Sequence, residues 1–208
     1  MERRKLFSAV LIISTFMVLQ CNGIFFGKRY NIRKFLSTSM PIWTHTTTIG
    51  SDEYCEVDVL QQLYKDVIYY THSSYEVTKG KLKKVHRKME GDFDKYDMYA
   101  HEKGHVTQNL KHEIVFLDET HHCAVILVLP MSDFAGRRSM ELRVWNSSIH
   151  TGPSHKCLKH YYSVESHGHV IYKPYCQKLV LNKHPSLLPH QQLQGRNHSL
   201  TIGQKPSG

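Results

Sequence analysis

Several features that mark enzymes and membrane proteins are missing from this sequence. It contains no Gly-x-Ser-x-Gly elbow and no glycine-rich loop that would cradle a phosphate. No two of its five cysteines have the Cys-x-x-Cys spacing of a zinc knuckle or a redox motif. The longest apolar run covers 14 residues, 6–19, whereas a helix that spans a bilayer needs roughly 20. We therefore expect a protein that is not an enzyme, uses no cofactor and does not insert into a membrane.

The first 23 residues have the layout of a secretory signal peptide. Three basic residues precede the apolar run, and Cys21 and Gly23 place small residues before a cleavage site. Removal of 1–23 leaves 185 residues with a net charge of +7, compared with +9 for the whole chain. We therefore expect a secreted, extracellular protein that meets no nucleic acid. Its basic residues are scattered apart from one dense run over 79–88, so they serve either solubility or attraction to anionic glycans, membranes or ligands.

Four cysteines remain after that cleavage: Cys55, Cys123, Cys157 and Cys176. In an oxidising compartment, an even set of cysteines predicts two disulfides. Counting alone leaves all three possible pairings open.

The middle of the chain consists of short segments rich in β-branched and aromatic residues, separated by polar, charged or glycine-containing breaks. Such spacing predicts an all-β sandwich or barrel in a single domain, residues 24–177. Pro153 and Ser154 precede a mixed apolar stretch, so we expect a short helix over 156–164. The polar composition of 178–208 predicts a flexible tail. The predicted strands cover 42–49, 55–60, 67–77, 112–117, 123–129, 140–145 and 170–175.

One pentapeptide matches a metalloprotease motif in a context that does not suit it. His101-Glu-Lys-Gly-His105 has the H-E-x-x-H spacing that places two histidines on one helix face around zinc. Gly104 lies inside that turn, no apolar helical period surrounds it, and the third histidine downstream is missing. We predict an exposed strand or turn here, and exposed loop residues at His121 and His122, rather than metal sites.

Four stretches of the chain resemble one protein family. The stretches are CAVILV at 123–128, ELRVWNSSI at 141–149, GPSHKCLK at 152–159 and YKPYCQ at 172–177. They are similar to the salivary lipocalins of ticks, the histamine-binding protein family, and the resemblance covers residues 42–177. It implies an eight-stranded antiparallel lipocalin barrel with a short C-terminal helix, an apolar cavity, and the disulfides Cys55–Cys176 and Cys123–Cys157. Members of this family sequester small host mediators, either amines such as histamine and serotonin or lipids such as leukotrienes.

The residues that this family uses for amines are only partly present. The resemblance places an acid directly after Cys123 and an aromatic residue after a Glu-Leu pair, but this chain has Ala124 and Arg143 there and keeps Glu141. Strand alternation places Glu141, Arg143 and Trp145 on one face. If that face is inward, Arg143 neutralises Glu141 and slightly favours a carboxylate-bearing lipid over an amine. Otherwise the two residues form a surface pair.

Strand position also suggests Trp43 and Phe116 as cavity aromatics. Tyr69 and Tyr70 are neighbours and point to opposite faces, so one of them should reach the interior.

Asn146 and Asn197 each begin an Asn-x-Ser sequence and are predicted glycosylation sites of a secreted chain. The alternative function is a protein-binding inhibitor of a host clotting or complement component, acting through loops and the basic surface. A ligand-sized internal cavity would favour the small-molecule hypothesis, and a barrel filled by side chains would favour the protein inhibitor.

Overall fold

The computed structural model of the protein describes residues 28–50, 53–105, 109–132 and 137–181. The predicted signal peptide, Asn197 and residues 182–208 of the predicted tail lie outside these ranges. Within the described ranges, no helix has the length and apolar character needed to cross a membrane.

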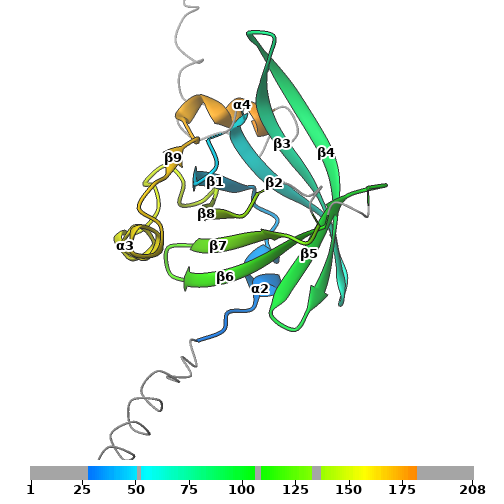
Figure 1. The fold of residues 1–208 in the computed structure, drawn as a ribbon, viewed down its shortest axis with the longest axis vertical. Helices are drawn as coiled ribbons and strands as arrows, with labels where there is room; N and C mark the ends of the chain where they lie inside the picture. The colour runs from blue at the N-terminus through cyan, green and yellow to red at the C-terminus, as the bar shows by residue number, and fades with distance from the viewer. Residues whose placement is uncertain (1–27, 51–52, 106–108, 133–136, 182–208) are drawn as a thin grey trace, which may run out of the picture.

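Eight antiparallel strands form a closed barrel (Figure 1). Each strand from β2 to β8 pairs with the next one along the chain, and β1 pairs with both β8 and β2, which closes the ring. A short ninth strand, β9, pairs with the end of β1 that β2 does not reach. The barrel is therefore confirmed and the sandwich is excluded. The strands are β1 (Ile42–Thr47), β2 (Glu53–Leu63), β3 (Val67–Thr78), β4 (Lys81–Asp94), β5 (Asp97–Glu102), β6 (Leu110–Asp118), β7 (Cys123–Pro130), β8 (Ser139–Trp145) and β9 (His169–Val170).

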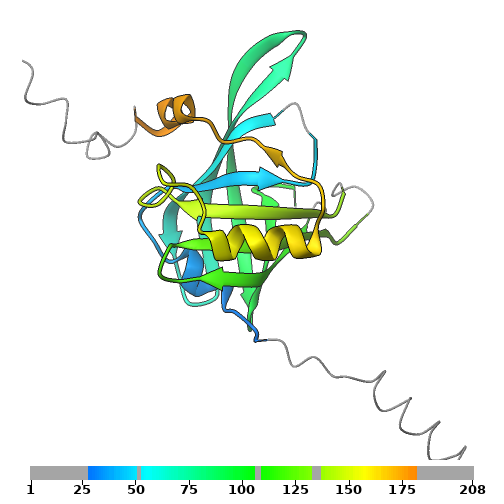
Figure 2. The same ribbon diagram turned by 90° about the vertical axis from the view of Figure 1, so that its left-hand side faces the viewer.

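Short helices lie at one end and along one side of this barrel (Figure 2). The helix expected over 156–164 is confirmed as α3, which packs against β6, β7 and β8. It begins where the Ser154 hydroxyl accepts a hydrogen bond from the backbone N–H of Cys157, as an N-cap residue does. The helical segments are α2 (Ile32–Leu36), α3 (His155–Val164), the 3-10 helix η1 (Pro174–Gln177) and α4 (Lys178–Leu181).

Two strands were not predicted from the sequence, and one predicted strand is mostly absent. β4 is rich in charged residues, which conceal the alternation of apolar and polar positions along a strand, and β5 is a short strand whose apolar residues, Met98 to Ala100, are consecutive and do not alternate. Of the strand expected over 170–175, only Val170 pairs, together with His169. Pro174 has no N–H to give to a sheet and instead begins η1.

The apolar side chains form two separate clusters. One lies inside the barrel and is covered at one end by Phe35 and Leu36 of α2. The other lies outside, between the barrel wall and the chain from α3 to α4, with Trp43 and Tyr161 at its centre. Successive residues of a strand point to opposite faces, so each wall strand contributes to both clusters.

Both disulfides stabilise the outer cluster. The structure contains Cys55–Cys176 and Cys123–Cys157, the pairing that the family resemblance implied. The first ties β2 to η1, and the second ties β7 to α3. Helix α4 extends this packing into the region predicted as tail, because Leu179 and Val180 are buried against the barrel. The outer cluster therefore includes two residues that follow position 177.

Candidate functional site

A buried ionic cluster lies in the barrel interior, and Arg143 is at its centre. The guanidinium donates hydrogen bonds to Asp58 from Nη1 at 2.8 Å and to Glu141 from Nε at 2.7 Å. Arg143 lies opposite Ala124 of β7 and Thr44 of β1, and its side chain is 6% exposed. Glu141 and Arg143 of β8 therefore face the barrel interior. They form an ion pair there and not on the surface.

His72 joins this cluster through Asp58. Its Nδ1 lies 2.7 Å from the second Asp58 oxygen, and the two residues face each other across β2 and β3. Burial alone would lower the pKa of His72, but the hydrogen bond and the charge of Asp58 outweigh it and raise the pKa to about 9. Burial opposes ionisation of Asp58 as well, yet Arg143 and His72 hold its pKa below the ordinary value. All three groups are therefore charged at neutral pH.

Glu56 supplies the third carboxyl group of the interior, after those of Asp58 and Glu141. It is two residues before Asp58 in β2 and therefore on the same face of that strand. Burial raises its pKa to about 7, and the nearby negative charge of Glu141 adds to the effect. Among the described residues, no hydrogen bond or ion pair engages the Glu56 carboxyl group. At neutral pH this group exchanges between its neutral and charged forms, and a bound cation would favour the charged form.

Two further buried polar atoms face the interior without a hydrogen-bond partner among the described residues. They are Nδ1 of His112 and Oγ of Ser74. Burial lowers the pKa of His112 to about 4, and the positive charge of Arg143 acts in the same direction. A neutral imidazole presents one donor and one acceptor, so a ligand in the barrel would find a polar group here.

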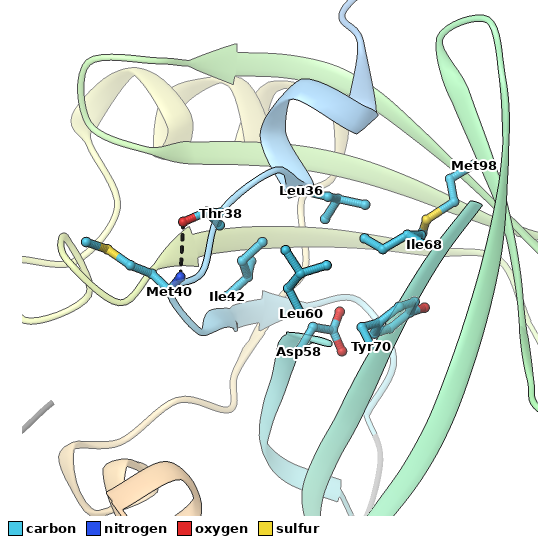
Figure 3. Close-up of a pocket in the computed structure, with 9 residues that line it drawn as sticks. All are labelled: Leu36, Thr38, Met40, Ile42, Asp58, Leu60, Ile68, Tyr70 and Met98. Atoms are coloured by element: carbon cyan, nitrogen blue, oxygen red, sulfur yellow. Dashed lines mark hydrogen bonds between the residues drawn. The ribbon is translucent and has the colours of Figure 1, made fainter. Parts of the chain in front are cut away.

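A pocket leads from the surface to this cluster beside α2 (Figure 3). Asp58 and Tyr70 lie at its inner end, and Met40, which is 40% exposed, lies at its outer end. Tyr70 is thus the tyrosine that reaches the interior, and burial raises the pKa of its hydroxyl. The pocket is narrow. Its cavity volume is about 10 Å³, which is enough for roughly one water molecule. Its lining residues are Leu36, Thr38, Met40, Ile42, Asp58, Leu60, Ile68, Tyr70 and Met98.

The predicted aromatic residues occupy different places. Trp145 packs against the interior cluster, and its indole N–H donates to the carbonyl of Phe35 at 3.1 Å. Trp43 belongs to the outer cluster, where it contacts Tyr172 and donates to Asn146 Oδ1 at 2.8 Å. Successive residues of a strand point to opposite faces, and since Ile42 points inward, Trp43 points outward.

Phe116 also lies outside the interior, contrary to the sequence expectation. It stacks on His160 of α3 at 4.7 Å. The register of β6 against β7 shifts between Ile114 and Phe116, so simple alternation does not place Phe116 correctly. We therefore leave Trp43 and Phe116 out of the candidate site.

The residues of the metalloprotease pattern are not on a helix. His101 is in β5, where it is buried and not exposed as expected, while His105 follows the Lys103–Gly104 turn. Within the described residues, no group of three His, Cys, Asp or Glu side chains is arranged to hold a metal ion.

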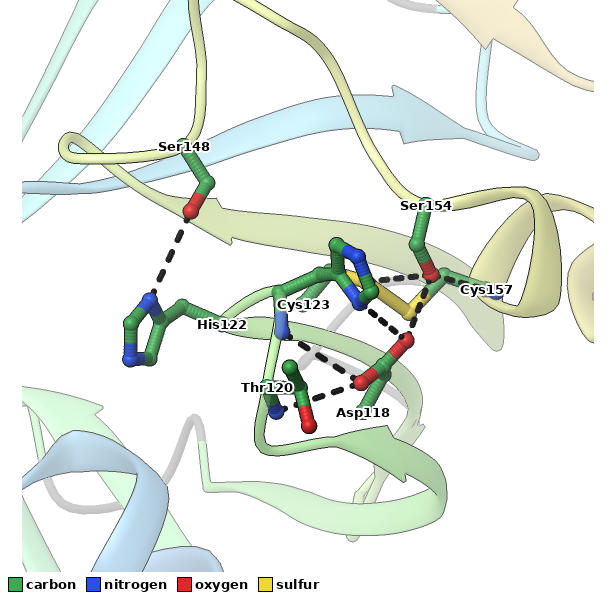
Figure 4. Close-up of a disulfide and its surroundings, with 8 residues drawn as sticks. Asp118, Thr120, His122, Cys123, Ser148, Ser154 and Cys157 are labelled. Carbon is green, nitrogen blue, oxygen red and sulfur yellow. Dashed lines mark hydrogen bonds and ion pairs between the residues drawn. A yellow bond between two sulfur atoms is a disulfide. The ribbon is translucent and has the colours of Figure 1, made fainter.

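The other histidine pair has structural contacts. His121 pairs with Asp118 at 2.9 Å, and the same carboxylate accepts a hydrogen bond from Ser154 beside the Cys123–Cys157 disulfide (Figure 4). His122 stacks on the ring of Trp145 at 4.5 Å.

The sequence matches no protein-family model and no curated protein, but the structure matches solved ones. The crystal structure of an AM182 serotonin complex superposes with a TM-score of 0.51 at 15% identity, covering 73% of this chain and 95% of the other. The fold is a lipocalin barrel.

Two further solved structures are similar to this barrel at lower scores. Japanin from Rhipicephalus appendiculatus bound to cholesterol gives a TM-score of 0.47 at 7% identity, covering 61% of this chain and 87% of that one. The siderocalin Ex-FABP gives 0.42 at 11% identity, covering 61% and 79%.

Proposed function

We propose that this lipocalin is a secreted protein of the tick salivary type. It binds a small cationic amine in the polar part of its barrel and sequesters it without chemical change. The observation that carries this proposal is the excess of acid in the interior. Glu56, Asp58 and Glu141 lie together with the two cations Arg143 and His72.

The same geometry removes the reason to favour a carboxylate-bearing lipid. That preference needed Arg143 to be available to a ligand, but its guanidinium already binds Asp58 and Glu141. An anionic ligand would have to replace one of these carboxylates or be buried near them without a partner, which is costly in a dry interior. An ammonium group instead finds Glu56, whose carboxyl group no described residue engages.

The narrow pocket also favours a small ligand. Each buried methylene of a lipid tail contributes about 0.8 kcal/mol only if the barrel has room for it. Here the side chains of Leu60, Ile68 and Met98 fill the space beside Asp58. Even a small amine requires movement of side chains at the entrance, where Met40 has an unbranched, adaptable side chain.

Isothermal titration calorimetry with serotonin, histamine and a leukotriene tests the proposal. We expect an amine to bind, and we expect Glu56→Gln to weaken it by about tenfold to a hundredfold because the ammonium loses its charged partner. Glu119→Gln is the matched control, because Glu119 is an exposed acid paired with Lys34. A leukotriene that binds more tightly than either amine, with unchanged affinity in Glu56→Gln, would refute the proposal.

A second candidate function is the protein-binding inhibitor. The specific observation in its favour is the small free volume of the pocket, since a protein inhibitor needs no ligand-sized cavity. Failure of every small ligand to bind a folded protein, together with capture of one defined plasma protein, would establish this alternative.

A further inference from the structure

The hairpin of β3 and β4 extends well beyond the barrel (Figures 1 and 2). β2 pairs with β3 only as far as Glu76, and β5 pairs with β4 only from Met89 onward. Among the described residues, no strand outside this hairpin pairs with 77–83, and all of these positions are exposed. Lys79 and Gly80 both have positive φ, which makes a tight two-residue turn and a narrow tip.

This hairpin tip, residues 77–83, is strongly basic. From residue 77 to residue 89 the chain has six Lys or Arg residues and no Asp or Glu. Arg87 is engaged by Glu53 and Glu76 at the base of the hairpin. Among the described residues, no ion pair engages the three lysines of the tip, Lys79, Lys81 and Lys83.

An exposed apolar pair lies between these lysines. Val77 and Leu82 are directly opposite each other in the hairpin, so their side chains share one face. They are 38% and 57% exposed. Such a pair at the most projecting point of a fold could contact a partner before any other apolar group does.

We propose that the hairpin tip docks on an anionic lipid membrane. The side chains of Val77 and Leu82 enter the boundary between headgroups and acyl chains, and the three lysines contact the anionic headgroups. A membrane uses both the cations and the apolar pair, whereas a sulfated polysaccharide would use only the cations and leave Leu82 in water. The tip is too short to span the bilayer, so the docking is peripheral and does not involve the barrel interior.

A purely structural role for the lysines is the competing explanation. β5 pairs with β4 only from Met89 onward, and lysines on the part of a strand that projects beyond its neighbour prevent strand pairing between molecules. This role predicts no affinity for lipid. It also predicts that variants without the lysines self-associate.

The test is cosedimentation of the purified protein with vesicles. One set is phosphatidylcholine alone, and the other contains phosphatidylcholine and phosphatidylserine in equal parts. We expect binding only to the second set, and weaker binding as salt is added. The triple variant Lys79→Gln/Lys81→Gln/Lys83→Gln should bind about a hundredfold more weakly, at about 1 kcal/mol per lysine and 1.4 kcal/mol per factor of ten. Leu82→Ser should weaken binding by roughly tenfold because an apolar side chain no longer enters the lipid.

A matched control removes the same charge elsewhere. Lys65, Lys156 and Lys159 are exposed residues away from the hairpin tip, and the triple Gln variant at these positions should bind like the unchanged protein. All substituted side chains are exposed, so thermal unfolding should confirm intact folds.

Several outcomes overturn the proposal. Absence of binding to anionic vesicles at low salt refutes it directly, and an equal loss in the two triple variants reduces it to a net-charge effect. Unchanged vesicle binding by Leu82→Ser would show that the tip recognises polyanions in general and not a membrane. Amine binding in the barrel should be the same in every variant, so this result is independent of the proposed function.

Discussion

The Asp58→Asn substitution tests the buried ionic cluster most directly. Asn keeps the shape of Asp58 but removes the negative charge that balances both Arg143 and His72. Arg143 now contacts two carboxylates and would keep only that of Glu141. His72 would lose the carboxylate that its Nδ1 contacts. Because both cations remain buried, the folded state should lose stability.

The size of this effect follows from the pKa of His72. A rise from the ordinary value of 6.5 to about 9 corresponds to about 3 kcal/mol of stabilisation of the charged form, at 1.36 kcal/mol per unit. The rise means that His72 contributes this stability fully below pH 6.5 and loses it as the pH rises through about 9. We therefore expect Asp58→Asn to lower the free energy of unfolding by about 3 kcal/mol at pH 6, within the range for breaking a buried ion pair. The difference between the two proteins should shrink above pH 9.

Urea unfolding at several pH values measures this difference, with Glu119→Gln as the control. The Lys34 and Glu119 side chains are 69% and 63% exposed, so breaking that pair should cost less than about 0.5 kcal/mol. NMR titration of His72 gives a second readout. Without Asp58, burial dominates and the pKa should fall below 6.5. A loss of less than 1 kcal/mol, or a His72 pKa that stays near 9 in the variant, would refute our account of the cluster.

Three further predictions follow from the described contacts. Serotonin affinity should rise about tenfold between pH 6 and pH 8 as Glu56 ionises with a pKa of about 7, and calorimetry in Glu56→Gln should give a flat profile. Replacing the disulfide Cys55–Cys176 by two alanines should lower the unfolding free energy by up to about 5 kcal/mol, since it closes a loop with a sequence separation of 121 residues; a guanidinium titration showing less than 1 kcal/mol would contradict this. Asn146→Gln should destabilise the protein by about 1–3 kcal/mol even without a glycan, because Oδ1 of Asn146 accepts hydrogen bonds from both Trp43 and Gln177; an unchanged melting temperature would contradict this role.

Much of the fold could be predicted because its apolar strands carry strong local patterns. β7, CAVILVLP, has few polar residues, since one face packs in the barrel and the other under α3. β4 could not be recognised in the same way. Most of its residues from Lys81 to Lys88 are exposed on a projecting hairpin, where no buried face imposes a pattern.

The candidate site was only partly visible in the sequence. Glu141 and Arg143 were found as a pair, because they are two residues apart on one strand. Asp58 and His72 were missed, since their contact joins β2 to β3 and no local spacing encodes it. A usable indication does exist in β2: Cys55, Val57 and Val59 alternate with Glu56 and Asp58, and the cysteine shows that the apolar face packs under the disulfide. The acids must then face the interior.

The arrangement of β2 explains how this barrel can hold so many charges inside. In the first half of β2, Cys55, Val57 and Val59 point outward and the acids point inward, the reverse of a barrel that is stabilised by an apolar interior. Such an arrangement is stable only if another apolar core compensates, and the outer cluster with its two disulfides provides that core. Substitutions in the barrel interior can therefore change its charge and its free space without removing the packing between the wall and α3. Trp43 illustrates the separation, because its aromatic ring stabilises the fold from outside while Ile42, its neighbour, lines the pocket.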